Sequence, residues 1–161
     1  MDLTDWDARI DAWYASEFDE SRPAQSIASM QALLAQHPQA GALATFDLAG
    51  VHDSLGLEDE AVPLYRQALA EGLDEAHSAR AHIQLASTLR NLGRLDEAIA
   101  LLSEPSGADA DASRRAFLAL ALHSAGRHDE ALREALEALI PTLPRYQRSL
   151  TGYAAELTDG R

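Results

Sequence analysis

Few residues in this chain could do chemistry, and they are scattered. Its six histidines form no HExxH pair or similar metal-binding spacing. His52 and Asp53 are neighbours, but on a helix their side chains point about 100° apart, so they do not form a catalytic dyad. The chain has no cysteine and no lysine, which excludes thiolate zinc sites, Schiff-base lysines and phosphate-loop lysines. We expect no catalytic residue, no cofactor and no metal. One alternative stays open: a weak metal site where His82 and His123 approach across neighbouring helices.

The formal net charge of −13 at pH 7 limits the classes of partner. Nucleic-acid affinity comes largely from Lys and Arg on phosphates, so nucleic acid is not an expected partner. The first residues, MDLTDWDARID, are acidic and lack the apolar segment of a signal peptide. The longest apolar run, residues 116–122, is too short to span a membrane. These features predict a soluble, cytoplasmic protein.

Apolar residues recur at helical spacing along most of the chain. Residues 82–102 show the pattern best, because leucines recur on one face up to Gly93 and Asp96 opens a second helix. Ser21 before Arg-Pro predicts a helix start with Ser21 as N-cap. We expect a connector at 73–78 and a loop at 106–112. The expected helices span residues 2–18, 23–36, 42–55, 59–71, 79–92, 96–102, 114–125, 129–140 and 145–157.

The two ends of the chain carry most of its aromatic residues. Near the N-terminus they predict a helix docked on a core rather than a ligand platform, through Trp6, Ile10, Trp13 and Tyr14. Near the C-terminus they predict a capping helix that is buried on one face only, through Tyr146, Leu150, Tyr153 and Leu157.

The chain states one pattern three times. Segments 55–61, 92–98 and 125–131 each contain a glycine, then two variable residues, then Asp-Glu-Ala. The glycines Gly56, Gly93 and Gly126 are 37 and 33 residues apart. Each segment follows a Leu-Ala pair at the same offset. A period near 34 residues with two helices per period indicates a helical repeat array.

This pattern resembles the tetratricopeptide repeat (TPR) family. The small first-helix residue of that family is matched by Ala49, Ala86 and Ala119, and its second-helix alanine by Ala61, Ala98 and Ala131. The family's first-helix tryptophan is absent. The segments QLASTLRNLG, YRQALAEGLD and LPRYQRSLTGYAAEL further resemble small stand-alone bacterial TPR proteins. That resemblance supports the fold and brings no activity with it.

The resemblance implies an all-α fold, a right-handed superhelix of antiparallel helix pairs. It would hold about three full repeats, a degenerate N-terminal helix pair and a C-terminal capping helix. We expect a single domain over residues 1–161. Its parts would be the degenerate pair 2–41, repeats 42–74, 79–112 (with a shortened second helix) and 113–141, and the capping helix 145–158. In this family, the first helices line a concave groove that binds a peptide or helix.

The central repeat places a polar stripe opposite its leucine face, with Arg80, Gln84, Ser87 and Asn91 at i, i+4, i+7 and i+11. Ser and Asn are indifferent helix formers, which favours binding over simple solvation; the alternative is the wet side of an amphipathic helix. The equivalent positions in the flanking repeats are Leu43, Asp47, Gly50 and Ser54, and Ser113, Phe117, Leu120 and Ser124. The expected protein-binding residues are Phe46, Asp47, Asp53, Arg80, Ile83, Gln84, Ser87, Arg90, Asn91, Phe117 and His123.

Two functions compete at this point. The first is a protein-interaction module that binds a peptide or partner helix in its groove, where Arg80 or Arg90 could receive a carboxylate. The second is a self-associating scaffold, a homo-oligomer in which Trp6, Trp13 or Tyr153 pack between copies. Neither requires an enzyme active site.

Overall fold

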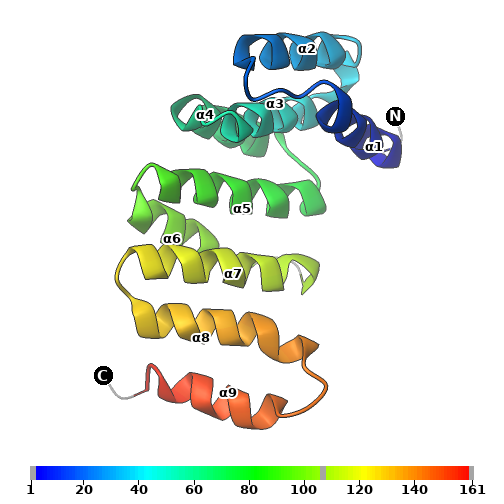
Figure 1. Ribbon diagram of the computed structural model, residues 1–161. Coiled ribbons are helices and arrows are strands. Elements are labelled where there is room, and N and C mark those ends of the chain that lie inside the picture. The colour runs from blue at the N-terminus through cyan, green and yellow to red at the C-terminus, as the bar shows by residue number, and fades with distance from the viewer. Residues whose placement is uncertain (1–2, 106–107, 160–161) are drawn as a thin grey trace. The chain divides into compact units, whose positions relative to one another are not determined.

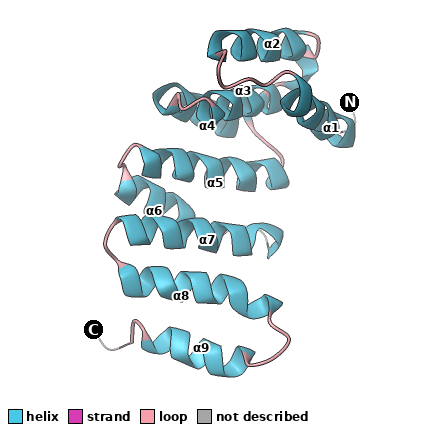
Figure 2. Cartoon of the chain, viewed as in Figure 1, coloured by secondary structure: helices cyan, strands magenta, loops and turns pink. Residues whose placement is uncertain are grey.

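The fold is all-α in the part of the chain that the computed structural model describes, residues 3–105 and 108–159. Its helices follow one another in antiparallel pairs (Figures 1 and 2), as the sequence predicts. They are α1 (Leu3–Ser16), α2 (Pro23–Ala35), α3 (Ala42–Ser54), α4 (Glu58–Glu71), α5 (Glu75–Asn91), α6 (Leu95–Ser103), α7 (Ala108–Ser124), α8 (His128–Leu139) and α9 (Gln147–Glu156), with short 3₁₀ turns η1 (Pro38–Ala40) and η2 (Ile140–Thr142).

The described helices belong to two compact units. The first, Met1–Ala81, contains α1 to α4 and the start of α5. The second, His82–Arg161, contains the rest of α5 and α6 to α9. Each unit has its own buried apolar side chains and is described by itself.

Three hairpins turn on the same backbone geometry. Gly56, Gly93 and Gly126 have φ of +70°, +74° and +75°, in the left-handed region that glycine adopts without a Cβ penalty. In each turn the following amide donates to the carbonyl five residues back. In the central turn, the amide of Arg94 donates to the carbonyl of Leu89 at 2.8 Å. This is the hydrogen bond of a Schellman C-cap, and it satisfies a carbonyl at the helix end.

Small residues allow the paired helices to approach closely. The repeated alanines of the second helices are buried, with Ala61 and Ala98 0% exposed and Ala131 6% exposed. Four residues later, Tyr65 and Leu102 are also buried, whereas Ala135 in the third hairpin is exposed. Helix α8 therefore differs from α4 and α6, because it has a small, exposed residue where they have a large, buried one.

Helix α1 packs into the core of the first unit. Trp6, Ile10 and Trp13 are buried against Met30 of α2 and Val51 of α3. The indole N–H of Trp13 donates to Ser29 Oγ at 3.0 Å. The prediction of a docked helix is confirmed. The idea that Trp6 or Trp13 packs between copies is wrong, because neither side chain reaches the surface.

Two segments expected to be irregular are helical. Helix α5 begins at Glu75 because the Asp74 carboxylate accepts the amide N–H of His77 at 3.1 Å, which caps the helix. Helix α7 begins at Ala108, and Asp111 pairs with Arg114 and Arg115 on the next turn. Of the expected loop 106–112, residues 106–107 lie outside the described part, as does residue 2.

Two local expectations fail. Ser21 is not the N-cap of α2: Arg22 holds that position, and Ser21 Oγ donates to Asp19 Oδ1 at 2.6 Å instead. At the N-cap of α9, Tyr146 is 75% exposed, and within the helix Tyr153 is 63% exposed, whereas Ala154 is buried. A small residue lets α9 lie close to α8, which leaves the tyrosines outside.

We predict opposite effects for two glycine substitutions. Gly93→Ala should lower the free energy of unfolding by about 1–2 kcal/mol, because alanine is strained at positive φ. Gly152→Ala should raise it by roughly 0.5–1 kcal/mol, because Gly152 is inside α9 and an added Cβ meets nothing within 4 Å. Urea unfolding of both variants measures the two effects. Equal effects would show that the turn geometry is unimportant.

Candidate functional site

The residues expected to bind a partner lie on the first helices of the pairs, with unequal exposure. Phe46, Asp47 and Ile83 are buried, whereas Asn91 and His123 are exposed. By helix, the set is Phe46, Asp47 and Asp53 on α3; Arg80, Ile83, Gln84, Ser87, Arg90 and Asn91 on α5; and Phe117 and His123 on α7. The structure groups these residues separately within each unit.

In the first unit, Arg80 contacts an aromatic ring and a carboxylate. Its guanidinium carbon lies 5.5 Å from the centroid of the Phe46 ring, a cation–π contact. Its Nη1 is 3.6 Å from Asp7 Oδ1 of α1. Both side chains of the Arg80–Asp7 pair are about half exposed, so the pair contributes little to stability by itself. Arg80 thus connects α1 to the predicted binding position Phe46.

Asp47 is the most unusual carboxylate of this unit. It is 8% exposed, and its Oδ2 accepts the indole N–H of Trp6 at 2.7 Å. Burial raises the pKa of Asp47 to about 6, and this outweighs the lowering by the Trp6 hydrogen bond and the nearby Arg80. A buried carboxylate with a raised pKa is a common mark of a functional position.

His77 joins α5 to α1. Its ring is 5% exposed, with Nδ1 at 2.6 Å from Asp74 Oδ2 and Nε2 at 3.2 Å from Asp7 Oδ1. The sequence analysis did not identify His77, Asp74, Asp7 or Trp6 as parts of this cluster. Asp74 three residues before His77 is a recognisable capping pattern, but the contacts with α1 span some 70 residues and leave no local signal.

Asp53 faces the partner helix of its own hairpin. Tyr65 Oη on α4 donates to Asp53 Oδ2 at 3.3 Å. Burial, followed by the charge of Asp53, raises the pKa of Tyr65. The nearby Gly50 leaves room for the Tyr14 hydroxyl, which would be 3.3 Å from an added Cβ. This end of α3 is therefore occupied by packing within the unit.

In the second unit, Arg90 bridges two first helices. Its Nε donates to Ser124 Oγ at 2.8 Å and to the Leu120 carbonyl at 3.3 Å, both on α7. Among the described residues, Arg90 has no carboxylate partner, whereas Arg94 and Arg127 each pair with a glutamate three residues on. Arg90 is held in place by neutral oxygens.

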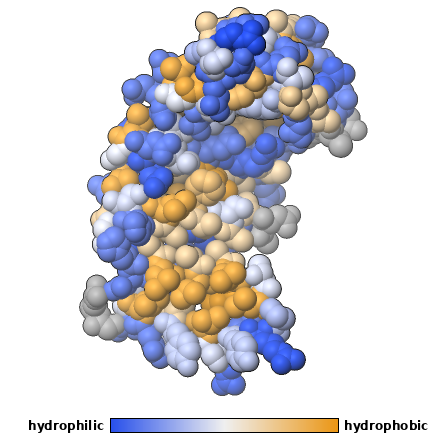
Figure 3. Space-filling model, viewed as in Figure 1, coloured by the Kyte–Doolittle hydropathy of each residue, from blue (hydrophilic) through white to orange (hydrophobic). Residues whose placement is uncertain are grey.

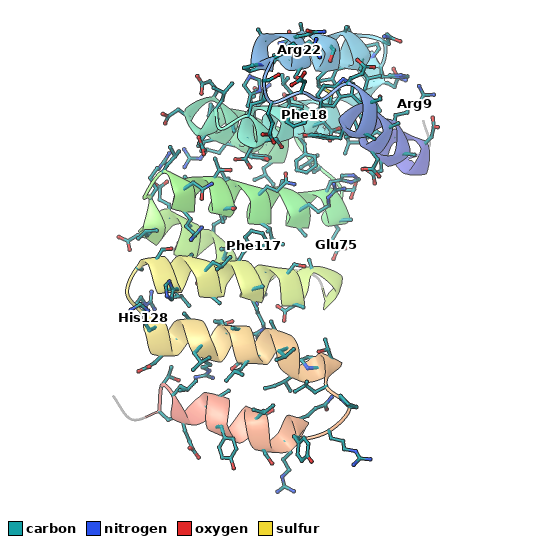
Figure 4. All side chains as sticks on the ribbon, viewed as in Figure 1. Arg9, Phe18, Arg22, Glu75, Phe117 and His128 are labelled. Carbon is teal, nitrogen blue, oxygen red and sulfur yellow. The ribbon has the colours of Figure 1, made fainter. Side chains whose placement is uncertain are left out.

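The surroundings of Arg90 combine polar and apolar groups. Leu120 is 49% exposed, and Asn91 and Ser124 are exposed. One turn earlier on each helix, Ser87 and Phe117 are partly buried. Phe117 lies on the side of α7 that faces α6 (Figure 4). We call Ser87, Arg90, Asn91, Phe117, Leu120 and Ser124 the Arg90 surface.

His123 pairs with a histidine that the sequence analysis did not single out. Its ring centroid is 4.9 Å from that of His128, across the Gly126 turn. In the described part of the chain, no three His, Cys, Asp or Glu side chains gather as metal ligands would.

Comparison with known proteins supports the repeat. A family model described as tetratrico peptide repeat matches residues 42–157, which covers the three hairpins and α9. No curated protein matches the chain. None of the helices within residues 3–105 and 108–159 has the length and apolar character needed to cross a membrane.

We predict that Asp47→Asn stabilises the protein at high pH. Because the folded pKa of about 6 lies above the ordinary 3.8, the ionised carboxylate destabilises the fold, and this effect is fully present above pH 6. Two pKa units correspond to about 3 kcal/mol. Asparagine keeps an acceptor for Trp6 and carries no charge, so the variant should be more stable at pH 8 by up to that amount.

The advantage of Asp47→Asn should shrink as the pH falls from 6 to 4, where the wild-type carboxyl takes up its proton. Asp74→Asn is the opposite control, because hydrogen bonding to the His77 amide lowers the pKa of Asp74. That variant should be less stable than wild type at pH 7, with the difference fading in acid. Denaturant unfolding at several pH values measures both. A pH-independent difference for Asp47→Asn would contradict the assignment.

Proposed function

The chain belongs to the tetratricopeptide repeat family, and we propose that it is a protein-interaction module whose Arg90 surface receives a carboxylate of a peptide or partner helix. Domains of this family are generally protein-interaction modules and typically not catalytic. The proposal adds the place of binding and the chemistry of the bound group. It rests on the second unit alone.

The state of Arg90 is the observation that carries the proposal. Its two hydrogen bonds to α7 use Nε, so they orient the guanidinium and leave the terminal Nη pair suited to a bidentate contact. An arginine fork matches a carboxylate in this way, and a pre-oriented fork loses little side-chain entropy on binding.

Two other arginines near the hairpin turns already have a carboxylate partner. Arg94 and Arg127, which follow hairpin glycines, each make two hydrogen bonds with a glutamate on the next turn. Such pairs are the ordinary surface arrangement on a helix. Arg90 lacks an equivalent among the described residues, which favours an external carboxylate over simple solvation.

The neighbours of Arg90 suit the rest of a peptide. Leu120, half exposed, and the partly buried Phe117 offer an apolar anchor. Asn91 and Ser87 offer hydrogen-bonding groups beside it. We propose that these residues contact the partner, with His123 at the edge. Ile83 is buried and lies outside the proposed contact.

The predicted residues of the first unit have a smaller part in the proposal. Trp6 and Asp7 of α1 contact Asp47 and Arg80, so a partner would meet α1 there before it met α3. We propose that Phe46, Asp47 and Arg80 position α1, and that partner recognition belongs to the Arg90 surface.

Selection from a random peptide display library tests the proposal. The selected peptides should share a carboxylate next to a large apolar residue. Arg90→Met should weaken their binding by about 10-fold or more, because a hydrogen-bonded charged group contributes about 1.5–3 kcal/mol.

Arg94→Met is the matched control, since it removes an arginine that lies outside the Arg90 surface and is paired with Glu97. It should leave the binding of the selected peptides close to that of wild type, because the Arg94 guanidinium already has a carboxylate partner. Peptides without a carboxylate, or equal losses in the two variants, would refute the assignment to Arg90.

A further inference from the structure

Helix α8 exposes two of its leucines and partly buries several of its charged side chains. Leu132 and Leu139 are 49% and 48% exposed, and His128 and Ala135 are exposed between and beside them at helical spacing. Hydrophobic side chains gather over α8 in Figure 3. We call His128, Leu132, Ala135 and Leu139 the α8 face.

Three charged residues of the same helix take part in contacts with neighbouring elements. Glu134 and Glu137 both pair with Arg115 of α7, and all three side chains are only 21–27% exposed. Arg133 pairs with Glu137 and donates to Thr158 Oγ1 after α9. The solvent-facing side of a helix ordinarily carries the polar residues, and its packed side the apolar ones. The α8 face is therefore a second surface of this unit that is suited to a partner.

We propose that the α8 face is the contact between two copies of this chain, packed α8 against α8 in antiparallel orientation about a two-fold axis near Ala135. Leu132 and Leu139 lie three and four residues on either side of Ala135. An antiparallel two-fold contact at that point places Leu132 of one copy beside Leu139 of the other. The single patch is thus complementary to itself.

The small residue at the centre fits a close helix contact. At the equivalent position the earlier hairpins carry Tyr65 and Leu102, which are 0% and 1% exposed. In the third hairpin the position is Ala135, and it is exposed. Alanine between two leucines leaves a shallow hole into which the leucines of a second helix can pack.

The charge distribution favours a second copy as the occupant. Residues 82–161 carry nine arginines and eleven acidic residues, whereas residues 1–81 carry four arginines and fifteen acidic residues. Two copies that meet through the second unit therefore meet through its nearly neutral part, where self-repulsion is small.

Sedimentation equilibrium over a range of concentrations tests the proposal directly. The mass should rise from 17.4 kDa toward twice that value as the concentration approaches about 100 μM. We expect weak association because the α8 face has only four residues and small interfaces bind weakly. Leu132→Glu and Leu139→Glu should each restore the monomer mass. Their positions are half exposed, so the variants should keep their helical circular dichroism.

Single cysteines locate the contact, since the chain has none of its own. Ala135→Cys should form a covalent dimer with a short bis-maleimide at high concentration. Ala100→Cys, at an exposed position of α6, should give only background cross-linking. A monomer throughout the range overturns the proposal. A dimer that survives Leu132→Glu, or that cross-links equally at both cysteines, overturns it as well.

Discussion

The three repeat hairpins share one constraint, a glycine with positive φ followed by a helix with a buried alanine. The turn at Gly93 reverses the chain within a few residues, and its Arg94–Leu89 hydrogen bond satisfies the helix end. Ala98, at 0% exposure, then allows the two helices to pack closely. Because the same geometry recurs at Gly56 and Gly126, the first helices present equivalent positions, and the Arg90 surface is one product of that equivalence.

The two units use their first helices differently. In the first unit, α1 covers the positions that correspond to the Arg90 surface, and the Trp6–Asp47 hydrogen bond fixes it there. In the second unit, the corresponding positions on α5 and α7 stay accessible, and Arg90 joins them through neutral oxygens. A raised carboxylate pKa in the first unit and a pre-oriented cation in the second are the two departures from ordinary repeat packing. We propose that an external carboxylate binds at the second of these, the pre-oriented Arg90.

Local signals predict the turns and the small packing residues, because glycine at positive φ and alanine at a helix contact are set by neighbours in sequence. The start of α5 is also set by a local signal, because Asp74 is an N-cap whose carboxylate accepts the His77 amide N–H. Contacts between distant residues are harder to predict from the sequence. Trp6 and Asp47 are 41 residues apart, and neither residue type indicates that the other is its partner. Arg90 and Ser124 are 34 residues apart, close to the repeat period, so their contact leaves a trace in the repeat alignment. The exposure of Tyr146 and Tyr153 does not follow from the sequence, because helical periodicity shows which residues share a face and not which face is covered.

The central claim is that Arg90 binds a carboxylate of the partner. A double-mutant cycle tests it: a selected peptide and its neutral carboxamide analogue are each titrated against wild-type protein and Arg90→Met. If the guanidinium meets the carboxylate, the two changes are coupled by about 1.5–3 kcal/mol, and the variant no longer distinguishes the two peptides. If the two losses add within about 0.5 kcal/mol, the carboxylate is bound elsewhere and the claim is wrong.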